Sequence, residues 1–375
     1  FLDWEKAFDK VDQEKMIEAM TRLNIPQKII NLLKSFYVNP RFRVKDREGK
    51  SDYRRQRAGI RQGCPLSPYL FICLMSVLFS DVHLEVEGKL LGRTYDYFNW
   101  WELTYADDTM LIGQRAREIN ILLAAIERES EKYNLKLNYN KCEYVAMNGE
   151  AHIHFSNGSP MKEVDHATYL GGVITKDAGR WTELNNRINK ALITCNKLKT
   201  FWYKTNCSYK WKLQVYNAVI VSQLTYGLST LQMTATMLNR LDAFQMRGLR
   251  YILKIEHSYY SRISNQEVFD KINIIVNKGT DINITWQEFI NASRFDKPKL
   301  IVKLSDYVMN QQNTLLGHVI RADPLDPMRQ PTINNDLQVP GIYKKRVGRP
   351  RLNWVYENCK WVYKKQFDEE YDCNN

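Results

Sequence analysis

Several features that define common protein classes are missing from this sequence. Its seven cysteines are scattered, with no C-x-x-C pair, which excludes a zinc knuckle or a disulfide framework and suits a reducing compartment. The longest apolar stretch, Tyr69 to Phe79, is far shorter than the roughly 20 residues that a membrane helix needs. No signal peptide, internal repeat or low-complexity tract is visible. We therefore expect an intracellular protein, nuclear or cytoplasmic and not secreted, that binds no membrane.

Acidic residues are also in deficit. The 375 residues include 54 Lys and Arg against 42 Asp and Glu, a net charge of +12 and a pI near 9.2. This excess favours a polyanionic partner, nucleic acid before a membrane surface, although many basic proteins bind nothing in particular. Hydrophobic residues make up 44% of the chain, enough for a large core, and the length allows two or three domains.

Strands and helices alternate up to about residue 175. Apolar spacing predicts helices at 14–24, from Pro26 onward, at 68–82 and at 115–133, the second with Ile29, Ile30, Leu33 and Phe36 facing inward. Residues 41–58 read as a basic hairpin, with nine Lys and Arg against three Asp and Glu between Arg41 and Arg61. Strands are expected around Tyr105 and at 135–139. These patterns indicate an α+β sheet domain.

Beyond residue 175 the pattern becomes helical. Residues 176–217 hold nine Lys and Arg against two Asp and Glu, interleaved with seven aromatic residues. A charge run is usually a solvated face, but this mixture favours contact with a nucleic-acid backbone. Residues 256–345 are rich in Asn, Asp and Pro and are expected to be rich in loops.

Two adjacent carboxylates stand between apolar runs in the stretch Leu103-Thr-Tyr-Ala-Asp-Asp-Thr-Met-Leu-Ile112. Asp107 and Asp108 repel each other, so something should compensate them. Taken alone, the pair is usually a polar hairpin turn. The alternative is half of a metal site.

Two further segments favour the metal site. Asp3 follows an apolar strand start in Phe1-Leu-Asp-Trp-Glu-Lys-Ala-Phe-Asp9, and Gly59-Ile-Arg-Gln-Gly-Cys-Pro-Leu-Ser-Pro68 is a glycine-bearing turn that opens a long helix. A strand-end aspartate and a hairpin-tip aspartate are what a two-metal phosphoryl-transfer site requires. Two or three aspartates suffice for Mg²⁺, because phosphate and water complete its octahedron.

In this order the segments resemble the reverse transcriptases of LINE-type, non-LTR retrotransposons. The resemblance covers about residues 1–176 and consists of polymerase motif A at Phe1–Asp12, motif B at Gly59–Phe71, motif C at Tyr105–Asp108, motif D at Leu135–Cys142, and a primer-grip hairpin at Tyr169–Ile174. A weaker resemblance to the ends of LINE polyproteins continues at Leu316–Arg321 and Gly348–Trp354.

The resemblance implies a catalytic set. Asp3 and Asp107 would hold two Mg²⁺ ions, with Mn²⁺ as a substitute, and Asp108 would be a weaker third ligand. Lys141 would give a proton or positive charge to the departing pyrophosphate, unless it is a solvated lysine at a strand end. The substrates would be an RNA template, a DNA primer and deoxynucleoside triphosphates.

The resemblance also implies binding residues. Phe8 would lie under the incoming sugar and exclude a 2′-hydroxyl, the alternative being an ordinary core phenylalanine. Gln62 and Gly63 would let the backbone approach the nucleotide, because glycine lacks a Cβ. The remaining candidates are Arg61 for the nucleotide, Arg57 for the template, Tyr105 under the primer terminus, and Leu170, Gly171 and Gly172 in the primer grip. For both arginines, a solvated hairpin face is the alternative.

The implied architecture is a right-hand polymerase palm at 1–175, an antiparallel sheet backed by helices, with a partial fingers insertion at about 38–60. A helical thumb at 176–255 and a basic, loop-rich C-terminal extension at 256–375 would follow. The family places its fingers strands before motif A, and this chain starts two residues before Asp3, so we expect most of the fingers to be missing.

Two classes of function stay open, and the first of them includes a variant. The first is an RNA-directed DNA polymerase from a non-LTR retrotransposon. A related polymerase, such as a group II intron maturase, is a variant of it. The other class is a truncated or domesticated reverse-transcriptase-like protein that binds nucleic acid without catalysis. The sequence leaves the oligomeric state open.

Overall fold

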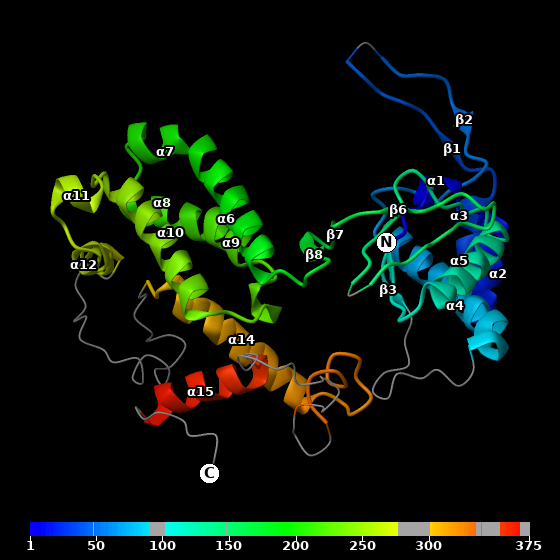
Figure 1. Ribbon diagram of the computed structural model, residues 1–375. Coiled ribbons are helices and arrows are strands. Elements are labelled where there is room, and N and C mark those ends of the chain that lie inside the picture. The colour runs from blue at the N-terminus through cyan, green and yellow to red at the C-terminus, as the bar shows by residue number, and fades with distance from the viewer. Residues whose placement is uncertain are drawn as a thin grey trace. The chain divides into compact units, whose positions relative to one another are not determined.

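The chain divides into two compact units in the computed structural model (Figure 1). The structure describes residues 1–47, 49–90, 102–147, 149–276, 301–334, 339 and 353–367. Unit 1 is Phe1–Ala178 and unit 2 is Gly179–Asn375. The division lies three residues beyond the predicted end of the palm at residue 175. Of the weaker resemblance at 348–354, residues 348–352 lie outside the described residues.

Four helices of unit 1 follow the predicted apolar spacing: α2 (Gln13–Arg22), α3 (Gln27–Tyr37), α4 (Ser67–Leu90) and α5 (Ala116–Glu131). A short helix, α1 (Ala7–Lys10), precedes them. Helix α2 begins at Asp12 because the carboxylate of this residue accepts hydrogen bonds from the N–H groups of Glu14 and Lys15, both at 2.9 Å. Its buried face includes Met16 and Met20.

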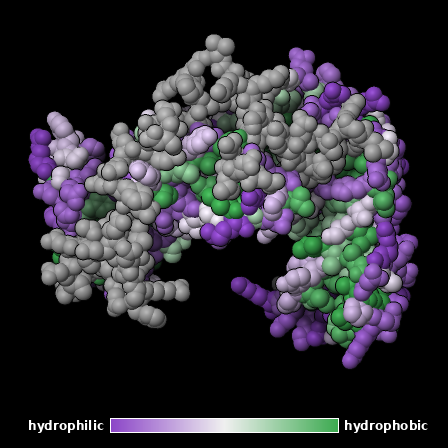
Figure 2. Space-filling view, turned by 90° about the horizontal axis from the view of Figure 1, so that it is seen from below, coloured by the Kyte–Doolittle hydropathy of each residue, from purple (hydrophilic) through white to green (hydrophobic). Residues whose placement is uncertain are grey.

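Helix α3 buries a narrower face than the sequence predicted. Ile30 and Leu33 are buried, whereas Ile29 is 47% and Phe36 is 43% exposed. The reason is that α3 packs on α2 with one stripe of its surface, and the two exposed residues lie beside that stripe. Apolar residues thus reach the surface of unit 1. Figure 2, seen from below, shows a band of them between hydrophilic residues on the half of the molecule that holds this unit.

The strands of unit 1 form two-stranded sheets. Antiparallel pairs join β1 (Arg41–Phe42) to β2 (Arg54–Arg55), β3 (Glu102–Tyr105) to β4 (Asp108–Leu111), and β7 (His166–Tyr169) to β8 (Gly172–Thr175), while β5 (Glu143–Tyr144) and β6 (Lys162–Glu163) are parallel. The strand predicted at 135–139 is wrong. Only a bridge between Trp4 and Leu137 forms there, because the chain crosses residues 3–5 and turns away at once.

Helix α4 is the centre of unit 1 and packs against α2 and α5. Its length and composition alone would allow it to cross a membrane, but half of the apolar stretch is buried within the protein. Phe71, Leu74 and Val82 have no exposed surface. Packing in the core thus accounts for the buried half of this stretch, while Tyr69, Ile72 and Leu84 of the same helix are exposed.

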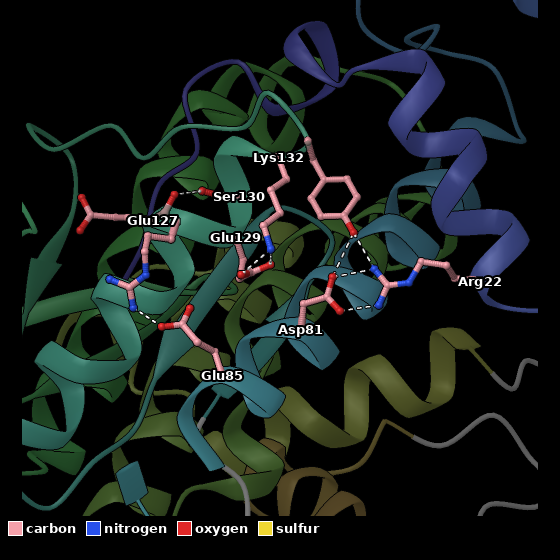
Figure 3. Close-up of polar contacts among 9 residues, drawn as sticks. Arg22, Asp81, Glu85, Glu127, Glu129, Ser130 and Lys132 are labelled. Atoms are coloured by element: carbon pink, nitrogen blue, oxygen red, sulfur yellow. Dashed lines mark hydrogen bonds and ion pairs between the residues drawn. The ribbon is translucent and has the colours of Figure 1, made fainter. Parts of the chain in front are cut away.

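Polar side chains join the same three helices at their surface (Figure 3). Arg22 of α2 donates to the carboxylate of Asp81 in α4 and, over 3.1 Å, to the Tyr133 hydroxyl just after α5. The guanidinium lowers the pKa of Asp81, while burial and the Asp81 carboxylate raise the pKa of Tyr133 to about 12. Arg128 of α5 likewise pairs with Glu85 of α4. These contacts fix the orientation of α4, whose N-terminal end follows the motif B loop.

The described part of unit 2 is helical. It contains α6 (Arg180–Lys197), α7 (Lys199–Lys204), α8 (Tyr209–Val215), the π-helix η1 (Tyr216–Val221), α9 (Ser222–Thr225), the 3-10 helix η2 (Leu228–Thr230), α10 (Ala235–Leu253), α11 (Ser258–Ser261), α12 (Asn265–Val276), α14 (Leu304–Arg321) and α15 (Trp354–Phe367).

Three of these helices, α11, α12 and α14, occupy residues 256–345, where composition predicted loops. Leu304 and Val308 of α14 enter the same core as Leu241 of α10. The prediction failed because the many Asn and Asp residues masked the spacing of Val268, Phe269 and Ile272, which are the buried residues of α12.

Candidate active site

Three distant segments meet at the N-terminus of unit 1. The Leu2 N–H donates to the Thr109 carbonyl, and the Asn138 N–H donates to the Asp3 carbonyl, both at 2.8 Å. The buried indole N–H of Trp4 donates to the Thr109 hydroxyl at 3.2 Å. These bonds place Asp3 between the β3–β4 hairpin and residues 138–142. Sequence reasoning did not single out Trp4, because its partner lies 105 residues away.

The β3–β4 hairpin presents the adjacent carboxylates at its tip. Tyr105 pairs with Asp108, so Ala106 and Asp107 form a two-residue turn. Ala106 has φ +54°, a left-handed conformation that is strained for a residue with a Cβ. Asp107 and Asp108 are exposed, and Tyr105 is 66% exposed. The turn predicted from the sequence is present, and Asp107 lies in it, outside the paired residues of β3 and β4.

Electrostatics link the three aspartates. Desolvation, and then the charges of Asp107 and Asp3, raise the pKa of Asp108. Across the described ranges, no three His, Cys, Asp or Glu side chains are already gathered as a metal cage. The carboxylates nevertheless fit a hard divalent cation, because they are oxygen ligands whose mutual repulsion a cation would relieve.

Residues 141 and 142 hold Asp3 from the other side. The Asp3 N–H donates to the Cys142 sulfur at 3.4 Å, and burial raises the pKa of this fully buried thiol. The Lys141 ammonium lies 3.7 Å from an Asp3 carboxylate oxygen and its side chain is 66% exposed. Lys141 therefore lies at the predicted site as a mobile counter-charge. Cys142 is a supporting residue that sequence reasoning missed, since only its place beside Lys141 pointed to it.

The motif B loop is fastened to the segment that follows Asp3. The Gly59 N–H donates to the Val11 carbonyl at 2.7 Å, and the Gln62 amide donates to the Asp9 carboxylate at 3.1 Å. Gly59 has φ +81°, and a Cβ there would lie 2.5 Å from the Asp9 carbonyl oxygen. Close backbone approach inside the protein thus requires glycine at 59, whereas the space around Gly63 (φ +80°) is open.

Phe8 lies between the core and the surface. Its ring stacks on Phe71 of α4, with centroids 4.6 Å apart and planes at 22°, and it stays partly exposed. Arg61 donates to the Phe36 carbonyl at 3.2 Å, and Arg57 lines a 960 Å³ groove between α2, α3 and β2. Stacking on Phe71 therefore holds the Phe8 ring in place within motif A. The Arg61 side chain is directed toward α3.

The predicted primer-grip hairpin is tied to the β3–β4 hairpin. Leu170 and Gly171 form the β7–β8 turn with φ +48° and +79°, and Gly172 pairs with Tyr169. The Tyr169 hydroxyl donates to the Leu103 carbonyl of β3 at 3.0 Å. Burial and the Asp108 charge raise the pKa of Tyr169. Tyr169 is a second supporting residue that the sequence did not reveal, although it stands beside the predicted Leu170.

Comparison with known proteins gives a consistent result. The model of the family described as reverse transcriptase (RNA-dependent DNA polymerase) matches residues 1–174. The Pol polyprotein of the type-1 retrotransposable element R2 from Nasonia vitripennis is 30% identical over 146 residues, or 39% of this chain and 14% of that protein. The RNA-directed DNA polymerase from the mobile element jockey of Drosophila melanogaster is 27% identical over 272 residues, or 67% of this chain and 28% of that protein.

A solved structure of Candida tropicalis telomerase is similar to this chain with a TM-score of 0.35 and 16% identity. The similarity covers 83% of this chain and 48% of the telomerase chain. This chain spans between 14% and 28% of the length of the two retrotransposon relatives named above. The family match covers the motifs around Asp3, Gln62 and Asp107 in order. Residues 1–174 thus match the reverse transcriptase family model, and the chain is similar to proteins of retrotransposable and mobile elements.

Proposed function

We propose that this protein is an RNA-directed DNA polymerase, which adds deoxynucleotides to the 3′-hydroxyl of a DNA primer on an RNA template. The observation that carries the proposal is the electrostatic cluster of Asp3, Asp107 and Asp108. Asp3 is more than a hundred positions from the other two in the sequence, yet its charge, after desolvation and the charge of Asp107, contributes to the raised pKa of Asp108. Carboxylates in this arrangement suit phosphoryl transfer, in which positioning and charge do most of the catalysis.

The three carboxylates would hold two Mg²⁺ ions, or Mn²⁺ in their place. Once bound there, these ions would lower the pKa of the primer hydroxyl and neutralise the triphosphate. The protein would position the rest. Lys141, exposed and 3.7 Å from Asp3, is free to turn toward the pyrophosphate that leaves when the new P–O bond forms.

The incoming nucleotide would be received by the motif A and motif B segments. Asp9 orients the Gln62 amide, and the space over Gly63 leaves room for a ligand. Phe8, supported by Phe71, would present a rigid ring edge to the sugar and select against a 2′-hydroxyl. Tyr105 and the turn at 170–172 would contact the primer terminus.

The surface of unit 2 suits a nucleic-acid backbone. Residues 179–255 contain twelve Lys and Arg but only two acidic residues. Glu183 is buried against Arg187, and the Asp242 carboxylate accepts bonds from the Ser305 N–H and hydroxyl. With both acids engaged in this way, the exposed charges of α6–α10 are cationic, which supports a template–primer partner.

The test is incorporation of labelled dTTP on poly(rA) primed with oligo(dT), in Mg²⁺. Asp107→Ala should reduce incorporation by about a hundredfold or more, as expected when charge stabilisation of a transition state is removed. Asp52→Ala changes an exposed carboxylate in the loop between β1 and β2 and is the matched control.

Equal incorporation by wild type and Asp107→Ala would contradict the proposed site. The assay is repeated on a longer parent protein that contains this chain. If both proteins bind the primed template with salt-dependent affinity but incorporate nothing, the non-catalytic interpretation replaces the polymerase.

A further inference from the structure

Helix α11, at the left edge of Figure 1, carries two neighbouring tyrosines. Tyr259 is 67% and Tyr260 is 73% exposed. Their ring centroids are 5.2 Å apart and their planes are nearly perpendicular, at 89°. Helix α11 has no buried residue, so these rings contribute little to the core.

A buried arginine, Arg250, holds the loop that carries the two tyrosines. Arg250 of α10 is 6% exposed. Its guanidinium donates to the carbonyls of Glu256 (3.2 Å) and Ile263 (2.7 Å), and to side-chain oxygens of Ser261 (3.5 Å) and Asn265 (3.0 Å). These bonds reach residues on both sides of α11. The exposed rings therefore stand on an ordered backbone, and little conformational entropy remains to be lost when they bind a ligand.

Cationic residues flank the two tyrosines in the chain. The Arg262 guanidinium lies 5.3 Å from the centroid of the Tyr259 ring. Lys254, exposed at the C-terminal cap of α10, connects this loop to the cationic surface of α6–α10. Flat apolar faces next to positive charge match a ligand that has aromatic bases and phosphates.

We propose that Tyr259 and Tyr260 form a stacking site for unpaired bases of single-stranded nucleic acid, with Arg262 and Lys254 contacting its phosphates. Unpaired bases are required because a duplex hides the base faces that a tyrosine ring would cover. The excess of basic over acidic residues in unit 2 favours a polyanion over a protein partner. The proposal does not rest on polymerase activity, since it concerns binding outside the carboxylate cluster.

The test measures fluorescence anisotropy of labelled twelve-residue oligo(U) RNA and oligo(dT) DNA, with a duplex of equal length as the comparison. Tyr260→Ala should weaken single-strand binding about tenfold, because stacking on one aromatic ring has an effect of this order. Duplex affinity and the slope of log Kd against log salt should stay unchanged. Tyr260→Trp should retain binding, and Arg262→Gln should reduce the salt slope.

Tyr226→Ala is the matched control, because Tyr226 is also an exposed tyrosine (56%) with a guanidinium, that of Arg187, over its ring. Far-UV circular dichroism checks that each variant is folded. An unchanged affinity of Tyr260→Ala would overturn the proposal, and so would an equal loss for single strand and duplex. A preference between the RNA and DNA oligomers identifies the ligand. Absence of nucleotide incorporation would affect only the proposed polymerase function.

Discussion

The two units use charge in opposite ways. Residues 1–178 contain 25 basic and 25 acidic residues, whereas residues 179–375 contain 29 basic and 17 acidic ones. The whole net charge of +12 therefore belongs to unit 2. In unit 1 several acids pair with bases, as Asp81 does with Arg22 and Asp3 with Lys141, while desolvation and the charges of Asp107 and Asp3 raise the pKa of Asp108. The total charge thus hides a neutral unit with an acidic centre and a unit with a cationic surface.

The difference in charge suggests separate roles for the two units toward a nucleic acid. An acidic centre repels phosphate unless cations accompany it, so unit 1 alone is expected to bind nucleic acid weakly. A cationic surface attracts phosphate but provides no ligands for a divalent ion. We expect catalysis to depend on unit 1 and affinity on unit 2.

The largest expected effect tests whether the units are independently stable. Trp202 is 1% exposed in the core of unit 2, and Trp202→Ala should lower the free energy of unfolding of that unit by about 3–5 kcal/mol. Unit 1 has its own core and should keep its stability. Hydrogen exchange in increasing urea measures this, comparing α10 with α4. Simultaneous loss of protection in both helices would show one cooperative structure in place of two.

The next effect tests the cationic surface. Replacing the exposed Lys197, Lys199 and Lys204 with Gln should reduce the slope of log Kd against log salt by up to about 2.7 for duplex nucleic acid. Replacing Arg41, Arg43 and Arg54 in unit 1 is the matched comparison. An equal change in slope for both triple variants would remove the distinction between the units.

A smaller effect concerns the contact between the two hairpins of unit 1. Tyr169→Phe removes the hydrogen bond to the Leu103 carbonyl and leaves the ring in place. We expect about a fivefold rise in KM for the primed template with a smaller change in kcat, in line with about 1 kcal/mol for one hydrogen bond. Tyr144→Phe is the control, because its hydroxyl also donates to a carbonyl in this unit, that of Ala151. Equal kinetics of the two variants would leave Tyr169 without a positioning role.

The smallest effect is a pH dependence confined to unit 1. His83 of α4 pairs with Glu102 of β3 at 3.0 Å, and this hydrogen bond raises the pKa of His83 above its ordinary value of 6.5. The stabilisation is complete below pH 6.5 and is lost as the pH rises through the raised value. Urea unfolding from pH 5.5 to 8.5 should show a loss below about 1 kcal/mol, as is usual for half-exposed pairs. In His83→Gln the loss should vanish, and its persistence would assign the dependence to another group.

Local patterns allowed much of the fold to be predicted. Periodicity predicted α2, α3, α4, α5 and the helical character of unit 2, and the β-rich residues around the polar break predicted the hairpin that carries Asp107. The order of the motifs predicted which residues would surround Asp3. These features depend on residues close together in the chain, and so a single sequence contains them.

The features that the sequence could not predict depend on contacts between residues far apart in the chain. Ile29 is as apolar as Ile30, and only the position of α2 decides which of them is buried. Cys142 supports Asp3 from 139 residues away, and Tyr169 reaches Leu103 across 66 residues. No local pattern distinguishes these supporting residues from their neighbours. The candidate site was thus predictable in its charged residues but not in the neutral ones that hold them.

Ala106 has a consequence for engineering. A stability-driven redesign would replace it with glycine, because an alanine at φ +54° costs about 1 kcal/mol that glycine avoids. Glycine would also give this two-residue turn more backbone conformations, and Asp107 would point in more directions. A redesign that scores folding alone would therefore select the change that most loosens the site, so this position should be held fixed in any stabilised version.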